Sequence, residues 1–149
     1  MRIVIQRVTR ASVSIEGRVE SAIEKGMMVL LGVEYADTDD GIDWLVKKTI
    51  NLRIFDDSEG VMNLSVKDVE GDILVVSQFT LMASCKKGNR PSYIHAASPD
   101  VSVPLYERFC QRLSESLGKP VATGVFGADM QVELVNDGPV TIVIDSKDK

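Results

Sequence analysis

The first residues that could do chemistry form the segment SQFTL, residues 77–81. Its hydroxyl and carboxamide groups can bind a polar substrate, and its phenyl ring offers a face for stacking. The segment closes an apolar strand pattern, and a strand end that feeds a loop is a common place for a site. In a continuing strand, Gln78 and Thr80 would share one face, while Ser77 and Phe79 would share the other. Taken alone, the pattern is more typical of an ordinary polar strand end.

The second such segment is NDGPVT, residues 136–141. Asp137-Gly138 is a dipeptide typical of a hairpin turn between two strands. Pro139 complicates that interpretation, because it removes a backbone donor where the return strand would begin. A Gly-Pro peptide bond can also be cis, although sequence alone does not say which isomer is present. A rigid Gly138-Pro139 unit would fix two carbonyl directions, and such carbonyls could accept hydrogen bonds from an ammonium group.

Other candidate nucleophiles and bases are few. The only histidine, His95, lies in a polar loop, where a lone histidine is more often solvated than catalytic. Cys110 falls in a helical pattern and is expected in the core, whereas Cys85 lies in a polar loop. A cysteine nucleophile needs a nearby histidine, and the two cysteines match neither a zinc pattern nor a disulfide framework. We expect no metal and no cofactor.

The periodicity of apolar residues predicts the strands that must position these segments. Residues 2–15 alternate between apolar and polar, which indicates one long strand that could carry a bulge. Glu16-Gly17 is a turn signal for a return strand. Six strands are expected, over residues 2–15, 18–23, 27–33, 72–77, 130–135 and 140–144.

Two helices complete the expected fold. The first begins at Thr38, and the second is capped by Ser102, carries Pro104 in its first turn and ends at Gly118. Residues 82–101 lack periodicity, and so long a loop in a small domain is more often functional than idle. This order predicts an α/β fold in which two main helices pack on a mixed, largely antiparallel sheet. The length suits a single domain, residues 1–149.

Composition narrows the class of protein. Of the 149 residues, 44% are hydrophobic and 26% charged, which is ordinary for a soluble globular protein. No apolar run reaches the roughly 18 residues that span a bilayer, and the first residues lack a signal-peptide layout, so we expect a cytoplasmic protein without a membrane partner. The net charge of −5 argues against a nucleic-acid partner unless a few local cations hold one RNA end. Lys86, Lys87 and Arg90 are such cations, although charge alone favours reading them as solvated surface residues.

Together, the two segments resemble the paired signature of D-aminoacyl-tRNA deacylases. The resemblance covers nearly the whole chain, because several further segments occur in the family's order. They are IQRVTRASV at 5–13, RIF at 53–55, NRPSY at 89–93, ASPD at 97–100 and GADMQVELVNDGPVT at 127–141. Met82 and Tyr93 depart from the residues that are frequent in the family, and this leaves the fine shape of the pocket open.

The resemblance implies an activity and an assembly. Members are homodimers that cleave the ester joining a D-amino acid to the 3′ end of tRNA, and they also act on glycine attached to a non-cognate tRNA such as tRNA-Ala. In the family the Gly-Pro unit, here Gly138-Pro139, is cis and reaches into the partner's site, where it binds the α-ammonium and blocks an L side chain. Arg7 matches an arginine that holds this unit. The residues Ser77, Gln78, Phe79 and Thr80 would surround the scissile ester and the terminal adenosine.

This selection scheme is physically coherent, because a rigid backbone cannot move aside for the wrong enantiomer, and glycine has no side chain to reject. The chemical step is open between two mechanisms. Thr80 could be a nucleophile, but its hydroxyl needs a base. Alternatively, backbone N–H groups near Phe79 and Thr80 could stabilise an oxyanion while the neighbouring ribose hydroxyl assists water, and we favour this second mechanism.

Three rival functions remain at this stage. The first is a related editing enzyme for mischarged L-aminoacyl-tRNA, which would need a trans Gly-Pro unit. The second is a non-catalytic dimer that binds a small amino acid or an RNA end. The third is a general small-ester hydrolase, against which the absence of a Gly-x-Ser-x-Gly motif counts.

Overall fold

The spine of the fold is one long strand, β1 (Arg2–Ile15), in a computed structural model that describes all residues from 1 to 149. Two strands pair antiparallel with successive halves of one edge of β1, namely β3 (Gly26–Gly32) with the first half and β2 (Arg18–Ile23) with the second. The opposite edge of β1 pairs antiparallel with β8 (Gln131–Asp145).

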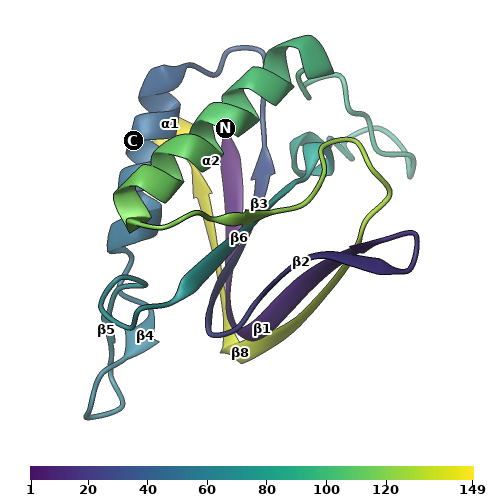
Figure 1. Cartoon of the computed structure of the whole chain (residues 1–149). Helices are drawn as coiled ribbons and strands as arrows, with labels where there is room; N and C mark the ends of the chain where they lie inside the picture. The colour runs from purple at the N-terminus through teal and green to yellow at the C-terminus, as the bar shows by residue number, and fades with distance from the viewer.

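The sheet continues from β3 through two parallel strands, β6 (Asp72–Ser77) and the short β7 (Ala122–Thr123). Because β1 bends, β2 swings round towards β7, and the Ser21 hydroxyl donates to the Thr123 carbonyl at 2.7 Å. The sheet is therefore curled and nearly closed (Figure 1). Inside the curl lies a small apolar cluster formed by Val8, Ala11, Val13, Ile23, Met28, Leu74 and Val76.

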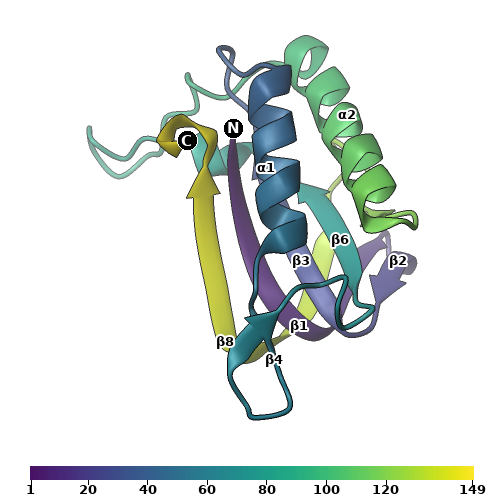
Figure 2. The same cartoon turned by 90° about the vertical axis from the view of Figure 1, so that its left-hand side faces the viewer.

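The larger core lies between the sheet and two helices, α1 (Asp39–Asn51) and α2 (Pro99–Leu117). The helices lie side by side and cover one face of the sheet (Figure 2). Each buries an apolar stripe at helical spacing, which is the reason why these segments are helical rather than extended. The mixed α/β fold with two main helices is thus confirmed. None of the helices combines the length and apolar content that crossing a lipid bilayer requires.

Four short elements complete the chain: β4 (Phe55–Asp56), β5 (Met62–Leu64) and the 3₁₀ helices η1 (Phe79–Met82) and η2 (Ser146–Asp148). Strands β4 and β5 form a separate two-stranded hairpin below α1. None of these short elements was predicted. Each is too short for its apolar pattern to stand out from that of a loop.

Most of the predicted elements are present within a residue or two. The turn at Glu16-Gly17 has φ values of 50° and 77°, the left-handed pair that a tight two-residue hairpin requires. The first helix begins after Thr38, as expected. The second was predicted too short, because it begins at Pro99 behind Ser98 rather than at a cap formed by Ser102. Ser102 is instead buried within the helix and donates to the Ser98 carbonyl at 3.0 Å.

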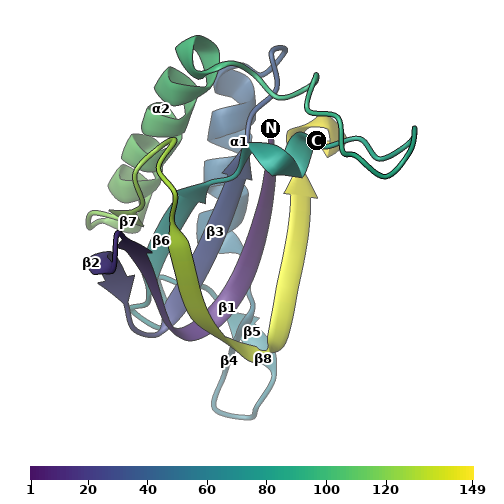
Figure 3. The same ribbon diagram turned by 90° about the vertical axis from the view of Figure 1, so that its right-hand side faces the viewer.

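The predicted late hairpin is wrong. Residues 131–145 form one continuous strand, both halves of which pair with β1 (Figure 3). Gln6 pairs with Thr141 and Val8 with Asn136, so the four residues 137–140 stand opposite Arg7 alone. We call these four residues the Gly-Pro excursion. Its base is closed by the Asn136 side chain, which accepts from the Val140 N–H and donates to the Thr141 hydroxyl, both at 3.1 Å. A local side-chain bridge thus replaces the chain reversal that Asp-Gly suggested.

Candidate active site

The first motif lies where β6 leaves the sheet. The Gln78 N–H still donates to the Leu31 carbonyl at 2.8 Å, but the chain then turns into η1. The alternation of faces predicted for residues 77–80 is therefore wrong beyond Gln78. It fails because β3 ends at Gly32 and offers no further partner for an extended chain. The turn instead brings the side-chain amide nitrogen of Gln78, Nε2, to 2.5 Å from the Thr80 hydroxyl.

This motif borders a cleft of about 250 Å³ that is mostly apolar. Ser77, Gln78 and Phe79 line one wall, whereas Thr80 stands outside the lining. The remaining lining residues come from the floor of the sheet and from the segment before β8: Val76, Phe126, Gly127, Ala128, Asp129, Met130 and Val132. A partly apolar recess with a few convergent polar groups is the usual form of a small-ligand site.

The segment before β8 is the part of the site that reasoning from the residues alone missed. Phe126 is held by an edge-to-face contact with Tyr106, at 5.6 Å between ring centroids, and the Tyr106 hydroxyl donates to the Val75 carbonyl. The signal that could have identified the segment is its place within GADMQVELVNDGPVT, the longest stretch of the family resemblance.

Phe79 stands at the mouth of the cleft. Its side chain is 55% exposed, which is unusual for a phenylalanine. Its ring meets that of Tyr93 edge to face, with 5.1 Å between centroids. An exposed aromatic pair beside a recess is suited to stacking a flat group such as a nucleobase.

No base is positioned to activate the Thr80 hydroxyl. Its hydrogen-bond partner is the Gln78 carboxamide, which cannot take up a proton near neutral pH in either orientation. His95 and Cys85 lie farther along the chain, and His95 lines a different recess. Burial raises the pKa of the Cys110 thiol to about 12, which leaves it protonated and unreactive. The geometry therefore provides no side-chain nucleophile with a base.

Backbone donors are available at the same place. The first hydrogen bonds of η1 run from the Leu81 and Ala83 N–H groups to the Gln78 and Thr80 carbonyls, so the N–H groups of Phe79 and Thr80 precede the first bond of the turn and have no partner within it. Unsatisfied backbone donors beside a recess can stabilise negative charge on an oxygen. No group of three or more His, Cys, Asp or Glu side chains is arranged to hold a metal ion.

The second motif is held by a buried arginine. The side chain of Arg7 is only 9% exposed, and its Nε donates to the Asp137 carbonyl at 2.9 Å. Its Nη1 donates to the Ile54 carbonyl at 2.7 Å and reaches the Asp56 carboxylate at 3.3 Å. The Gly138-Pro139 peptide bond is cis, and both residues are exposed to solvent.

The chain does not bring its two motifs together. Along β3, the pairing partner of Arg7 is Met27 and that of Ser77 is Leu31, four residues or about 13 Å apart. Across the sheet, β1 and β3 lie between β8 and β6. In Figure 3, β8 bends at its lowest point, in the middle of the strand where the excursion lies, and the teal turn that follows β6 lies at the upper end of the sheet. Within one protomer, the Gly-Pro excursion does not meet the cleft.

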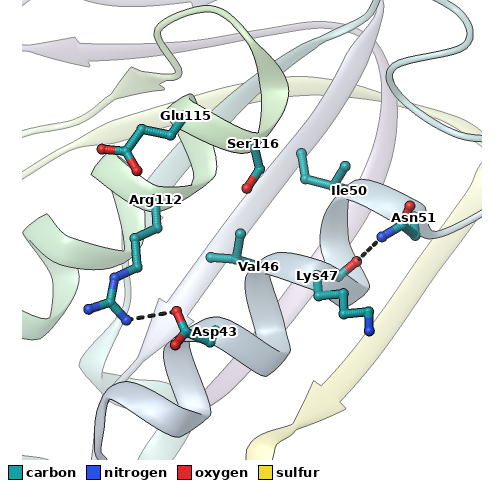
Figure 4. Close-up of a pocket in the computed structure, with 8 residues that line it drawn as sticks. All are labelled: Asp43, Val46, Lys47, Ile50, Asn51, Arg112, Glu115 and Ser116. Carbon is teal, nitrogen blue, oxygen red and sulfur yellow. Dashed lines mark hydrogen bonds and ion pairs between the residues drawn. The ribbon is translucent and has the colours of Figure 1, made fainter.

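A larger recess, of about 410 Å³, lies between the two helices (Figure 4). Its charged wall is an ion pair in which Arg112 lies 2.7 Å from the Asp43 carboxylate, and Val46 and Ile50 point into the gap. These charges are already neutralised by one another, and neither motif contributes to the walls. We therefore take the smaller cleft beside Phe79 as the candidate active site.

Comparison with known proteins gives consistent matches. A family model described as D-Tyr-tRNA(Tyr) deacylase matches residues 4–145. A D-aminoacyl-tRNA deacylase of Bacteroides fragilis is 66% identical over 149 residues, which cover 100% of this chain and 99% of that protein. A solved structure described as c-Myc DNA Unwinding Element Binding Protein superposes with a TM-score of 0.93 at 42% identity, covering 97% of this chain and 98% of its own. The fold alone is shared with a probable eukaryotic D-amino acid tRNA deacylase, with a TM-score of 0.82 at 21% identity over 96% and 97% of the two chains.

The contacts of Arg7 predict a large loss of stability on its removal. Arg7→Met should lower the free energy of unfolding by about 2–4 kcal/mol, because it leaves the buried Ile54 carbonyl and the part-buried Asp137 carbonyl without donors. Arg10→Met is the matched control on the same strand, where the Arg10–Glu133 ion pair is exposed. That change should cost below about 1 kcal/mol. Urea unfolding of both variants measures the difference, and equal losses would contradict the role given to Arg7.

Proposed function

Because the chain belongs to the D-Tyr-tRNA(Tyr) deacylase family, we propose that it hydrolyses the ester of D-aminoacyl-tRNA, releasing the free D-amino acid and tRNA. The observation that carries this proposal is the identity of 66% with a D-aminoacyl-tRNA deacylase across the full chain, with both motif segments inside the match. Such a substrate would place the activity in the cytoplasm.

We further propose that the active enzyme is a homodimer in which the Gly-Pro excursion of one subunit enters the cleft of the other. Three features support this arrangement. Gly138 and Pro139 are exposed and lie away from the cleft of their own chain. β8 pairs with β1 on one edge only and leaves its other edge free for a partner. Along that strand Val135 and Val143 are exposed, and a partner that pairs with this edge could cover them.

In this arrangement, the partner's excursion would select the enantiomer. The backbone carbonyls around Gly138-Pro139 would accept hydrogen bonds from the α-ammonium of the substrate. The same rigid segment would clash with a side chain in the L position. Arg7 would keep the segment from yielding, because it holds the Asp137 carbonyl from within the protein. Glycine attached to a non-cognate tRNA such as tRNA-Ala has no side chain to clash and would be hydrolysed too.

The proposed chemical step relies on backbone donors and on the substrate. Water adds to the ester carbonyl, and the Phe79 and Thr80 N–H groups stabilise the oxyanion that forms. The neighbouring ribose hydroxyl of the substrate assists the attacking water, the ester C–O bond breaks, and the ribose oxygen leaves as a hydroxyl. Ser77 and Gln78 would position the ester, and no cofactor is needed.

Particular observations argue against the rival functions. An L-editing enzyme would need an open excursion, whereas here Arg7 holds the segment through the Asp137 carbonyl. A general esterase would need an activated nucleophile, and Thr80 has no base. Measured hydrolysis of D-aminoacyl-tRNA would exclude the non-catalytic binding protein.

The first prediction concerns enantiomer selection. At equal enzyme concentration, D-Tyr-tRNA should be hydrolysed rapidly while L-Tyr-tRNA stays intact, because only the L side chain would meet the excursion. Release of tyrosine is measured over time against an enzyme-free reaction. Hydrolysis of the L-ester alone or of both esters would point to the L-editing rival, and hydrolysis of neither would favour a binding protein.

The second prediction concerns Thr80. Thr80→Ala should lower kcat on D-Tyr-tRNA by less than about tenfold, because its backbone N–H is retained and its hydroxyl has no base. Loss of a true nucleophile would cost about 10⁴-fold or more. Thr80→Ser is the matched control that keeps a hydroxyl. A loss of that larger size in the alanine variant, restored by serine, would establish the nucleophilic mechanism instead.

The third prediction concerns the composite site. Phe79→Ala should lower kcat/KM on D-Tyr-tRNA by at least about tenfold, because the stacking contact with the substrate is lost. Pro139→Arg should lower the activity at least as much, because it places a cation where the substrate's ammonium would bind. Both residues are exposed, so neither change disturbs the core.

Mixing the two impaired proteins under conditions of subunit exchange tests whether each site is built from both subunits. A mixed dimer would hold one doubly altered site and one unaltered site, so activity should recover to about a quarter of the wild-type level. Native mass spectrometry measures the fraction of mixed dimers. If mixed dimers form and activity stays at the average of the two parents, the excursion does not act across the interface.

A further inference from the structure

A second functional surface adjoins the candidate active site. Residues 83–96, which we call the cationic loop, connect η1 to the segment before α2. The loop carries four basic side chains and no aspartate or glutamate: Lys86, Lys87, Arg90 and His95. In a chain of net charge −5, this is an uneven distribution of charge that the fold alone does not require.

The loop is a defined structure rather than a loose connection. Ser84 and Ser92 exchange two backbone hydrogen bonds, at 2.8 and 2.9 Å, which close residues 85–91 into a projecting tip. Its two ends are fixed to the body, where Arg2 donates to the Leu81 carbonyl and the Ala97 N–H donates to the Val33 carbonyl. In Figures 2 and 3 the loop extends away from the sheet and helices into open space.

The cations of the tip are not used within the chain. Lys86, Lys87 and Arg90 are exposed and form no ion pair. The carboxylate of Glu34, which lies near the base of the loop, is paired with Lys147 at 2.6 Å. The positive charge of the loop is therefore available to a partner.

The shape of the loop also suits an anionic partner. A recess of about 210 Å³ is lined by two hydroxyls, two ammonium groups and an imidazole, from Ser84, Ser92, Lys86, Lys87 and His95, together with Ile94. These are donors that bind phosphate oxygens. Tyr93 follows directly and touches Phe79 at the mouth of the cleft. Cationic donors thus lie next to an aromatic pair at the mouth of the candidate active site. This combination is typical of surfaces that bind single-stranded nucleic acid.

We propose that the cationic loop binds the backbone phosphates of the unpaired 3′ end of the tRNA, just before the terminal nucleotide. This inference rests on the proposed function, since it assumes an aminoacyl ester in the cleft. Only a few phosphates need be held, so the net negative charge of the protein is no obstacle. Long-range repulsion elsewhere on the surface would then make the loop the place where the RNA approaches.

The test compares two substrates that differ only in the presence of these phosphates. One is D-Tyr-tRNA, and the other is D-tyrosine esterified to adenosine alone. The triple variant Lys86→Gln, Lys87→Gln, Arg90→Gln should lose about tenfold or more in kcat/KM on D-Tyr-tRNA. The slope of log kcat/KM against log salt concentration should become shallower by about 2. On the adenosine ester, which cannot reach the loop, kcat/KM should stay within about twofold of wild type.

A matched control removes the same amount of charge elsewhere. Arg18, Lys47 and Lys67 are also exposed and unpaired, and they lie on β2, on α1 and after β5. Their replacement by glutamine should leave kcat/KM on D-Tyr-tRNA within about twofold, because direct phosphate contacts outweigh net charge.

The possible outcomes separate this inference from the proposed function. Wild-type enzyme that hydrolyses neither ester would refute the proposed function itself. With wild type active, a loop variant that keeps its rate and salt slope on D-Tyr-tRNA would overturn phosphate binding by the loop. So would an equal loss in the control variant, which would indicate net charge alone, or an equal loss on the adenosine ester, which would indicate a disturbed cleft.

Discussion

A guanidinium enclosed by protein needs acceptors for its donors, and in this chain two segments far apart in the sequence supply them. Arg7 on β1 is bonded to the Ile54 carbonyl beyond α1, to Asp56 in β4 and to the Asp137 carbonyl in the Gly-Pro excursion. Leaving such a charge buried without partners costs several kcal/mol, so the fold is more stable with both segments in place. The excursion is thereby fixed by the same side chain that joins the segment after α1 to the sheet.

The candidate site offers groups that bind and stabilise charge rather than a reactive side chain. The cleft has an aromatic mouth, a carboxamide and free backbone donors, but no side-chain base beside a nucleophile. Such a site can position an already labile ester and stabilise charge on it. Rigidity then matters more than reactive side chains, and the structure provides rigidity at both motifs, through Arg7 on the excursion and through the Leu31 pairing beneath Gln78.

Sequence periodicity predicted the elements that bury a regular apolar stripe, because burial itself imposes that regularity on β1, β3, β6 and both helices. It failed where one side chain decides the path. Asn136 bridges the base of the excursion, and this cannot be told from a hairpin turn by looking at Asp-Gly. The end of β3 at Gly32 forces the turn at Phe79, a non-local cause. Phe126 lines the cleft from a segment without periodicity, and Met130 was predicted only as the first residue of a strand, so the fold alone placed both in the site.

The excursion has one more consequence, which concerns solubility. β8 is a long edge strand with exposed valines, and an uninterrupted edge of that kind is a template on which other extended chains can aggregate. Residues 137–140 break the edge near its middle, and Pro139 has no N–H to offer an incoming strand. The free edge of β8 is therefore divided into two short stretches that point in different directions, and it does not form one continuous template. The residues proposed to test the handedness of a substrate thus also interrupt an edge that could otherwise template amyloid-like growth.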